Sequence, residues 1–176
     1  HVTVIQPSAV RPSRLADVVI GERMIRQVTP PGTAIAPPNA VVIDGRGKYL
    51  IPGLTDAHVH IKEGDPLFLF LAAGVTTVQN MAGQPFHLAM REQVNRGTLL
   101  GPRIVTTGPT TAQVGVTTPE EVATLVKEQQ ALGYDAIKMY GSRGGDMTRE
   151  AYHTLNEVAR SKGLRVVGHA PRNLPF

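Results

Sequence analysis

The sequence contains no cysteine and no tryptophan, and aromatic residues make up only 5% of its 176 residues. Without cysteine, the chain can form no disulfide and has neither a thiol nucleophile nor a thiolate metal ligand. The absence of cysteine does not decide the compartment. We expect a cytoplasmic protein by default. Because the chain begins at His1 and not at Met, an exported protein whose signal has been removed is the alternative.

Long hydrophobic runs are also missing. The longest run covers residues 66–78, and Gly74 and two threonines interrupt it, so it is too short and too polar to span a bilayer. A concentrated basic surface is missing as well. The net charge is +4, but lysine and arginine are scattered, and no basic run is interleaved with aromatic residues. We therefore expect neither a membrane nor a nucleic acid as partner.

Residues 1–50 contain short β-branched runs separated by proline and glycine, a pattern that predicts a small β-sheet domain. The expected strands cover residues 2–5, 16–21, 24–28 and 40–45.

From residue 51 to residue 176, short apolar runs alternate with segments of helical period. Strands are expected at 54–61, 75–80, 103–107, 136–140 and 165–169, and helices at 66–73, 86–96, 119–132 and 148–162. Thr118 and Thr148 are suitable N-caps, and Gly133 and Gly163 follow the last helical residues. Such alternation is typical of a parallel sheet. No GxGxxG motif follows the first strand, which favours a (β/α)8 TIM barrel over a doubly wound sheet. The expected fold class is thus α/β, with about five of eight barrel strands.

Two histidines stand one residue apart in the stretch LIPGLTDAHVHIKEG, which covers residues 50–64. Side chains alternate along a strand, so Asp56, His58 and His60 share one face and residues 57, 59 and 61 share the other. In a barrel the apolar face packs against helices, and the opposite face carries catalytic groups at the carboxyl end of the strand. Two imidazoles on that face suit a borderline cation such as Zn²⁺.

The same alternation turns Lys138 inward, together with Tyr140, and places His169 at the end of the fifth strand. Each residue also has an ordinary structural interpretation. A strand-end histidine can be a hydrogen-bonded core residue, and an inward lysine can be an ion-pair partner. His87 and His153 fall in predicted helices, and we expect both on the surface.

Several segments resemble the amidohydrolase superfamily of metal-dependent hydrolases, in particular its imidazolonepropionase-like and prolidase-like members. The resemblance covers essentially the whole chain. VVIDGRGKYLIPGLTDAHVHI is similar to the entry to the barrel in that family, and AAGVTTVQNM, GPRIVTTGP, GYDAIKMY and GLRVVGHA are similar to its second to fifth strands.

The resemblance implies a role for each matching residue. His58 and His60 would bind the more buried of two divalent metals, with Zn²⁺ as the default. Lys138 would be carboxylated by CO₂ and bridge the two metals, and His169 would bind the second metal; Lys138 and His169 are therefore also the candidate catalytic residues. A metal-activated hydroxide would attack an amide, cyclic amide or peptide C–N bond.

The resemblance also implies that a sixth strand supplies a further histidine and an eighth strand an aspartate, and neither follows Phe176 here. Five strands cannot close a barrel and would leave an open edge. We therefore expect a fragment of a longer protein, completed by the rest of its parent chain or by a homo-oligomer. A non-catalytic scaffold and a module that binds a single metal are the alternatives.

The substrate is expected to be a small amide or peptide held by the loops that follow the strands. Tyr140, Arg143 and Arg172 are the candidate substrate contacts, because either arginine could clamp a carboxylate as a dipeptidase requires. The alternative is that both arginines are solvated loop residues. The family acts on peptides, cyclic amides, nucleobases and synthetic amides and esters, and the residues do not choose among them.

Overall fold

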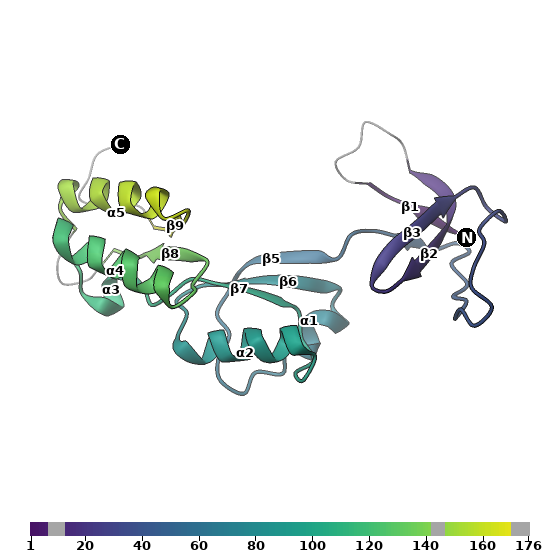
Figure 1. Cartoon of the computed structure of the whole chain (residues 1–176), viewed down its shortest axis with the longest axis horizontal. Helices are drawn as coiled ribbons and strands as arrows, with labels where there is room; N and C mark the ends of the chain where they lie inside the picture. The colour runs from purple at the N-terminus through teal and green to yellow at the C-terminus, as the bar shows by residue number, and fades with distance from the viewer. Residues whose placement is uncertain (7–12, 142–146, 170–176) are drawn as a thin grey trace. The chain divides into compact units, whose positions relative to one another are not determined.

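The computed structural model describes residues 1–6, 13–141 and 147–169 (Figure 1). The chain divides into two compact units, one over residues 1–52 and the other over residues 53–176. Each unit has its own secondary structure and is described separately below.

The first unit is a four-stranded sheet with the order β3-β2-β1-β4. Its strands are β1 (Val2–Val4), β2 (Arg14–Gly21), β3 (Met24–Thr29) and β4 (Tyr49–Leu50). Strand β2 pairs antiparallel with β1 and β3, whereas β1 pairs parallel with β4. Glu22 and Arg23 join β2 to β3 with φ values of 51° and 63°, as a two-residue type I′ turn requires.

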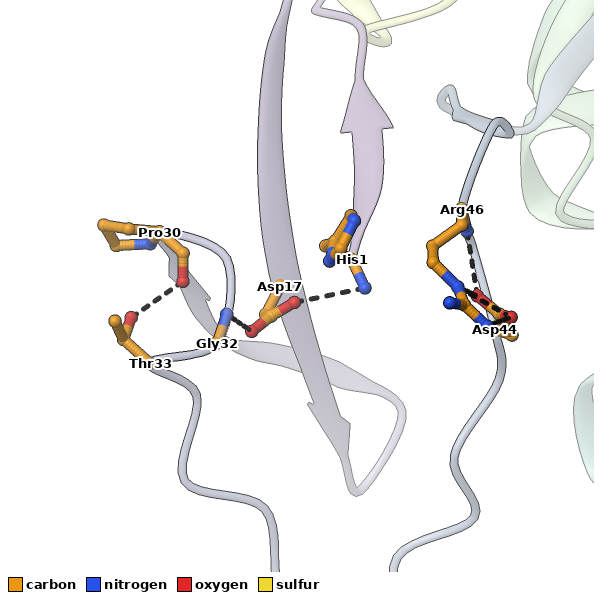
Figure 2. A network of polar contacts seen from close by, with 7 residues as sticks. All are labelled: His1, Asp17, Pro30, Gly32, Thr33, Asp44 and Arg46. Carbon is orange, nitrogen blue, oxygen red and sulfur yellow. Dashed lines mark hydrogen bonds and ion pairs between the residues drawn. The ribbon is translucent and has the colours of Figure 1, made fainter.

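Asp17 on β2 holds the turn that follows β3 in place (Figure 2). Its Oδ2 accepts a 2.6 Å hydrogen bond from the backbone N–H of Gly32, and its Oδ1 lies 3.2 Å from the amino group of His1. The hydrogen bond from Gly32 is the main reason why the pKa of Asp17 lies below its usual value. The hydroxyl of Thr33 donates to the carbonyl of Pro30 at 2.8 Å and closes the turn.

The strand predicted at residues 40–45 is wrong. This segment has no regular secondary structure, and Val41, Val42 and Ile43 expose more than 80% of their surface. Its β-branched composition favours an extended backbone, but a strand also needs a neighbour with which to exchange hydrogen bonds. The strand next to β1 on this side of the sheet is β4, a two-residue strand that the sequence did not predict.

The second unit alternates strands and helices as the sequence predicts. Its strands are β5 (Leu54–Val59), β6 (Val75–Asn80), β7 (Arg103–Thr106), β8 (Ala136–Met139) and β9 (Arg165–Gly168). Its helices are α1 (Phe68–Ala72), α2 (Pro85–Arg96), α3 (Thr111–Val114), α4 (Pro119–Ala131) and α5 (Arg149–Ser161). Only the short α3 was not predicted.

All strands of the second unit that pair with each other are parallel. Strands β5, β6 and β7 form one sheet and β8 and β9 form another. A parallel bridge between Thr107 and Ala136 connects β7 to β8, so the strands follow one another in chain order. This confirms the parallel α/β class. The described strands do not close into a barrel, and the count of eight strands remains a prediction.

Two hydrophobic clusters hold the helices against the strands. The first joins Ile61, Leu67, Val78 and Ile104 with residues of α1 and α2. The second buries one side of α4 and α5 against β8 and β9, and its members include Val122, Ile137 and Leu155, all fully buried. Each cluster therefore covers the helix-facing side of one sheet.

The predicted helix ends are confirmed. The Thr118 hydroxyl accepts from the N–H of Glu121 at 3.3 Å, and the Glu121 carboxylate accepts from the N–H of Thr117 and of Thr118, which lowers the pKa of Glu121. Gly133 and Gly163 have φ values of 86° and 71° after the last turns of α4 and α5. Within residues 1–6, 13–141 and 147–169, no helix is long and apolar enough to cross a membrane.

Truncation of Leu155 should destabilise the second unit strongly. Leu155 lies on α5 and is completely buried in the second hydrophobic cluster. Leu155→Ala should therefore lower the free energy of unfolding by about 2–5 kcal/mol. Leu132→Ala is the matched control because Leu132 is 62% exposed, and it should cost less than about 0.5 kcal/mol. Urea unfolding followed by circular dichroism measures both. Equal losses in the two variants would contradict this packing.

Candidate functional site

His58 and His60 lie together at the carboxyl end of β5. Their Nε2 atoms are 3.3 Å apart and their ring centroids are 5.2 Å apart, which confirms that the two side chains share one face. On the opposite face, Ile61 is 5% exposed and packs with Val59 in the first hydrophobic cluster, as predicted. Ala57, also predicted on that face, is exposed.

The strand is irregular where it carries the histidines. Asp56 pairs with Val78 and Val59 pairs with Asn80, so β5 has one more residue than β6 over this interval. The Asp56 carboxylate accepts a 3.1 Å hydrogen bond from the N–H of His58 within this bulge. Bulges beside functional sites re-aim side chains and end regular pairing. Strict alternation did not predict this bulge.

Lys138 is 2% exposed, and all of β8 around it is buried. Burial lowers the pKa of Lys138, because the charged ammonium loses its hydration there. No ion pair or hydrogen bond of its side chain is found within the described ranges. The structural alternative, an inward lysine held by an acidic partner, therefore has no support in this part of the chain.

His169 follows β9 and lies against Tyr140, which follows β8. The two ring centroids are 4.7 Å apart, and the N–H of His169 donates to the carbonyl of Met139 at 3.1 Å. Gly168 makes this approach possible: a Cβ at this position would lie 1.9 Å from the Met139 oxygen, and its φ is 134°. The glycine lets the end of β9 lie directly on the end of β8.

The four candidate ligands interact electrostatically. The pKa of His58 is lowered first by loss of hydration and then by the positive charges of Lys138, His60 and His169, in that order. Asp56 acts in the opposite direction. The structure thus brings Lys138 and His169, from β8 and β9, into the electrostatic surroundings of the histidine pair on β5.

Of the three candidate substrate contacts, only Tyr140 can be placed. It is 46% exposed, and the Thr111 hydroxyl holds its backbone by donating to its carbonyl and accepting from its N–H, both at 3.1 Å. Arg143 and Arg172 lie outside the described residues. Thr111 opens α3, the helix that the sequence analysis missed, although Thr110 and Gln113 have the spacing of a capping box that could have indicated it.

The surface position predicted for His87 is wrong, whereas His153 is exposed as expected. His87 is 2% exposed. Its Nδ1 accepts from the N–H of Gln84 and its Nε2 contacts the carbonyl of Ile61, both at 2.8 Å. The Ile61 carbonyl belongs to the segment after β5, 26 residues earlier in the chain, so the burial of His87 depends on a contact that is distant in sequence.

The spacing of the histidine pair fits a shared metal ion. Two nitrogens bound at about 2.05 Å to a tetrahedral Zn²⁺ lie about 3.3 Å apart. The observed separation of Nε2 atoms is 3.3 Å. No group of three or more His, Asp or Glu side chains able to hold a metal is found among the described residues. The histidine pair therefore has no third His, Asp or Glu ligand within this part of the chain, whereas Lys138, whose charge acts on His58, is a group of another type.

No protein-family model matches the chain. Among curated proteins it is 43% identical over 49 residues to dihydroorotase of Staphylococcus aureus strain Mu50, a match that covers 27% of this chain and 11% of that protein. The dihydroorotase of strain MRSA252 is 41% identical over 49 residues, again 27% of this chain and 11% of that protein. These matches are local and fall short of aligning the whole molecule.

The solved structures align over nearly the whole chain. A Bifidobacterium longum protein assigned as a prolidase has a TM-score of 0.82 and 28% identity over 97% of this chain and 48% of its own. Bottromycin amidohydrolase has a TM-score of 0.75 and 26% identity over 98% of this chain and 38% of its own. Molinate hydrolase, at 20% identity and a TM-score of 0.79, shares the fold over 97% of this chain and 52% of its own. The chain spans about half the length of these structures or less.

Replacement of Gly168 should separate the ends of β8 and β9. Gly168→Ala should lower the free energy of unfolding by about 1–3 kcal/mol or more, because the new Cβ overlaps the Met139 carbonyl and φ is unfavourable for alanine. It should also remove the NMR contact between the Tyr140 and His169 rings. Gly141→Ala is the control, since nothing lies within 4 Å of a Cβ there. An intact ring contact in Gly168→Ala would refute this role for the glycine.

Proposed function

We propose that this chain, which belongs to the amidohydrolase superfamily, carries part of the active site of a metal-dependent hydrolase of carbon–nitrogen bonds. The observation that supports the proposal most directly is the position of His58, His60, Lys138 and His169 at or just after the carboxyl ends of three parallel strands, with His58 and His60 paired at 3.3 Å. Carboxyl ends of strands are where barrel enzymes carry their catalytic groups. The names of the similar structures, a prolidase and two hydrolases of other compounds, agree with this reaction class.

His58 and His60 would hold one divalent metal through their Nε2 atoms, and Zn²⁺ is the default. Lys138, as a carbamate, would bridge to a second metal held by His169. When bound, such metals lower the pKa of water and polarise a carbonyl group, which is the chemistry that amide hydrolysis needs. The protein's part is to hold the imidazoles at a fixed spacing and to keep the lysine dehydrated.

Burial of Lys138 prepares it for carboxylation. The lowered pKa makes its neutral amine more available, and only the neutral amine has the lone pair that attacks the carbon of CO₂. A nitrogen–carbon bond forms, one proton leaves to solvent, and the product is a carbamate anion. The positive charge at this position is replaced by a negative one, which removes the repulsion that Lys138 exerts on His58.

The proposed substrate is a small amide, cyclic amide or peptide bound over the ends of the strands. Tyr140 is half-exposed beside His169, so its phenol is available to a substrate there. Arg143 and Arg172 are proposed to pair with a substrate carboxylate. A module that holds one metal through the histidine pair is the second candidate. The metal-binding experiment described below distinguishes this module from the hydrolase.

Loss of one imidazole should abolish tight metal binding. His58→Ala should weaken Zn²⁺ binding by at least about 100-fold, because a single remaining imidazole cannot chelate. His153→Ala is the matched control, an exposed histidine on α5, and should bind as the parent chain does. Isothermal titration of metal-free protein gives both affinity and stoichiometry. Two equivalents support the hydrolase site, one supports the single-metal module, and no binding by the parent chain rejects both.

Carboxylation of Lys138 should be visible directly. Protein incubated with ¹³C-bicarbonate and Zn²⁺ should show a carbamate carbon signal by NMR, and Lys138→Met should lose it together with the second equivalent of metal. Lys127→Met removes an exposed lysine from α4 and should change neither. A carbamate signal that persists in Lys138→Met would assign the modification to another residue.

A further inference from the structure

We propose that Asn80 and His87 are positioning residues that fix the spacing of the histidine pair by holding the backbone of Ile61, the residue after His60. The inference rests on the proposed metal-binding function of the pair, but its structural part can be tested without metal. Neither residue was singled out by the sequence motifs. Both are almost completely buried, with exposed fractions of 0% for Asn80 and 2% for His87.

Ile61 is held by all of its groups. Its N–H donates to Oδ1 of Asn80 at 2.9 Å, and its carbonyl accepts from Nε2 of His87 at 2.8 Å. Its side chain packs in the first hydrophobic cluster. Since β5 ends at Val59, the strand ladder no longer supports the chain at this point, and these two side chains take over that role.

The orientation of the Asn80 amide follows from its neighbours. The Thr106 hydroxyl donates its proton to the carbonyl of Thr107 at 3.0 Å, so its oxygen can only accept from Nδ2 of Asn80, at 3.1 Å. The amide oxygen is therefore the atom that faces Ile61. The end of β5 is thus connected through Asn80 on β6 to the end of β7.

The tautomer of His87 follows in the same way. Its Nδ1 accepts from the N–H of Gln84 at 2.8 Å, so the ring proton is on Nε2 and is donated to the carbonyl of Ile61. His87 lies in the first turn of α2, which packs through Met90 and Val94 on the same cluster as Ile61. The start of α2 and the end of β5 are therefore joined by a hydrogen bond and by shared packing.

We call the two hydrogen bonds by which Asn80 and His87 hold Ile61 the clamp. The clamp matters because the histidine pair lies on an irregular strand end. Within the bulge between Asp56 and Val59, the N–H of His58 donates to the Asp56 carboxylate of its own strand. If the backbone beyond His60 were free, the two rings could separate, and a chelating pair requires a nitrogen spacing of about 3.3 Å. Holding Ile61 on both sides removes that freedom before any metal binds.

The test compares variants of the whole chain that lose the clamp with one that loses stability elsewhere. Asn80→Leu and His87→Phe remove the hydrogen bonds to Ile61 while filling the same space. His87→Gln keeps a donor that can reach the carbonyl. Leu155→Ala is the control. Leu155 belongs to the other hydrophobic cluster, so its truncation should destabilise the protein without changing a contact of Ile61. All measurements are made where each variant is folded by circular dichroism.

Zn²⁺ affinity should fall about 10- to 100-fold in Asn80→Leu and His87→Phe, a range typical for loss of groups that orient metal ligands. His87→Gln should recover part of this loss, and Leu155→Ala should stay within about threefold of the parent, in line with the independence of separate sites. Parent-like affinity in both clamp variants, or an equal loss in Leu155→Ala, would overturn the proposal.

A second measurement needs no metal and separates this proposal from the proposed function. In metal-free protein, NMR should show slow exchange of the Ile61 amide proton and a contact between the His58 and His60 ring protons. Both should be lost in Asn80→Leu and His87→Phe and kept in Leu155→Ala. If the parent binds no Zn²⁺ but the ring contact depends on the clamp, the function fails and the positioning holds; a ring contact that persists in both clamp variants rejects the positioning.

Discussion

The two sheets of the second unit are joined where β7 meets β8, and Asp135 takes part in this junction with both its backbone and its carboxylate. Its Oδ2 accepts from the N–H of Thr106 on β7 and from Arg91 on α2, each at 2.8 Å. The N–H of Asp135 in turn donates to the Thr106 carbonyl at 2.9 Å. The strand pairing at this junction is a single bridge, and the Gly108 N–H and the Thr111 hydroxyl add further hydrogen bonds across it. The histidine pair lies on one side of this junction and Lys138 with His169 on the other, so the candidate site spans the junction.

Period-two alternation predicted much of this site because it is a local rule. A strand end fixes which side chains share a face, so the pairing of His58 with His60 and the burial of Lys138 followed from residue positions alone. The rule could not predict the bulge at residues 56–59, because a bulge depends on the register with β6. It also could not place His87, whose burial depends on a segment 26 residues away in the chain.

The other errors have the same origin. Residues 40–45 have the composition of a strand, but composition does not specify which neighbour a strand will have. The helix boundaries were predicted well because caps are local: Thr118 and Gly133 act within a few residues of themselves. The similar solved structures agree with the parallel α/β architecture that the alternation predicted. The chemistry proposed for the site rests on four side chains placed at strand ends.

The backbone is closely packed at several strand ends near the candidate site. A Cβ on Gly83, after β6, would lie 1.9 Å from the Thr107 carbonyl, and one on Gly108, after β7, would lie 2.3 Å from Gln129. At Gly83, after β6, and at Gly168, in β9, the overlap would be with backbone, so neither position admits a side chain without a shift of the chain. Such contacts leave the backbone little room to shift, which suits a site whose ligand atoms must keep a fixed spacing.

The exposed segment Val41–Ile43 has a consequence for how the protein behaves in concentrated solution. Three consecutive exposed β-branched residues favour pairing between molecules, the first step of β-aggregation. Directly after them, Asp44 and Arg46 form an ion pair at 2.7 Å. Charged residues that flank such a stretch act as gatekeepers, because a stacked copy would bring like charges together. Asp44 and Arg46, which take no part in the candidate site, thus help to prevent association of the protein in concentrated solution.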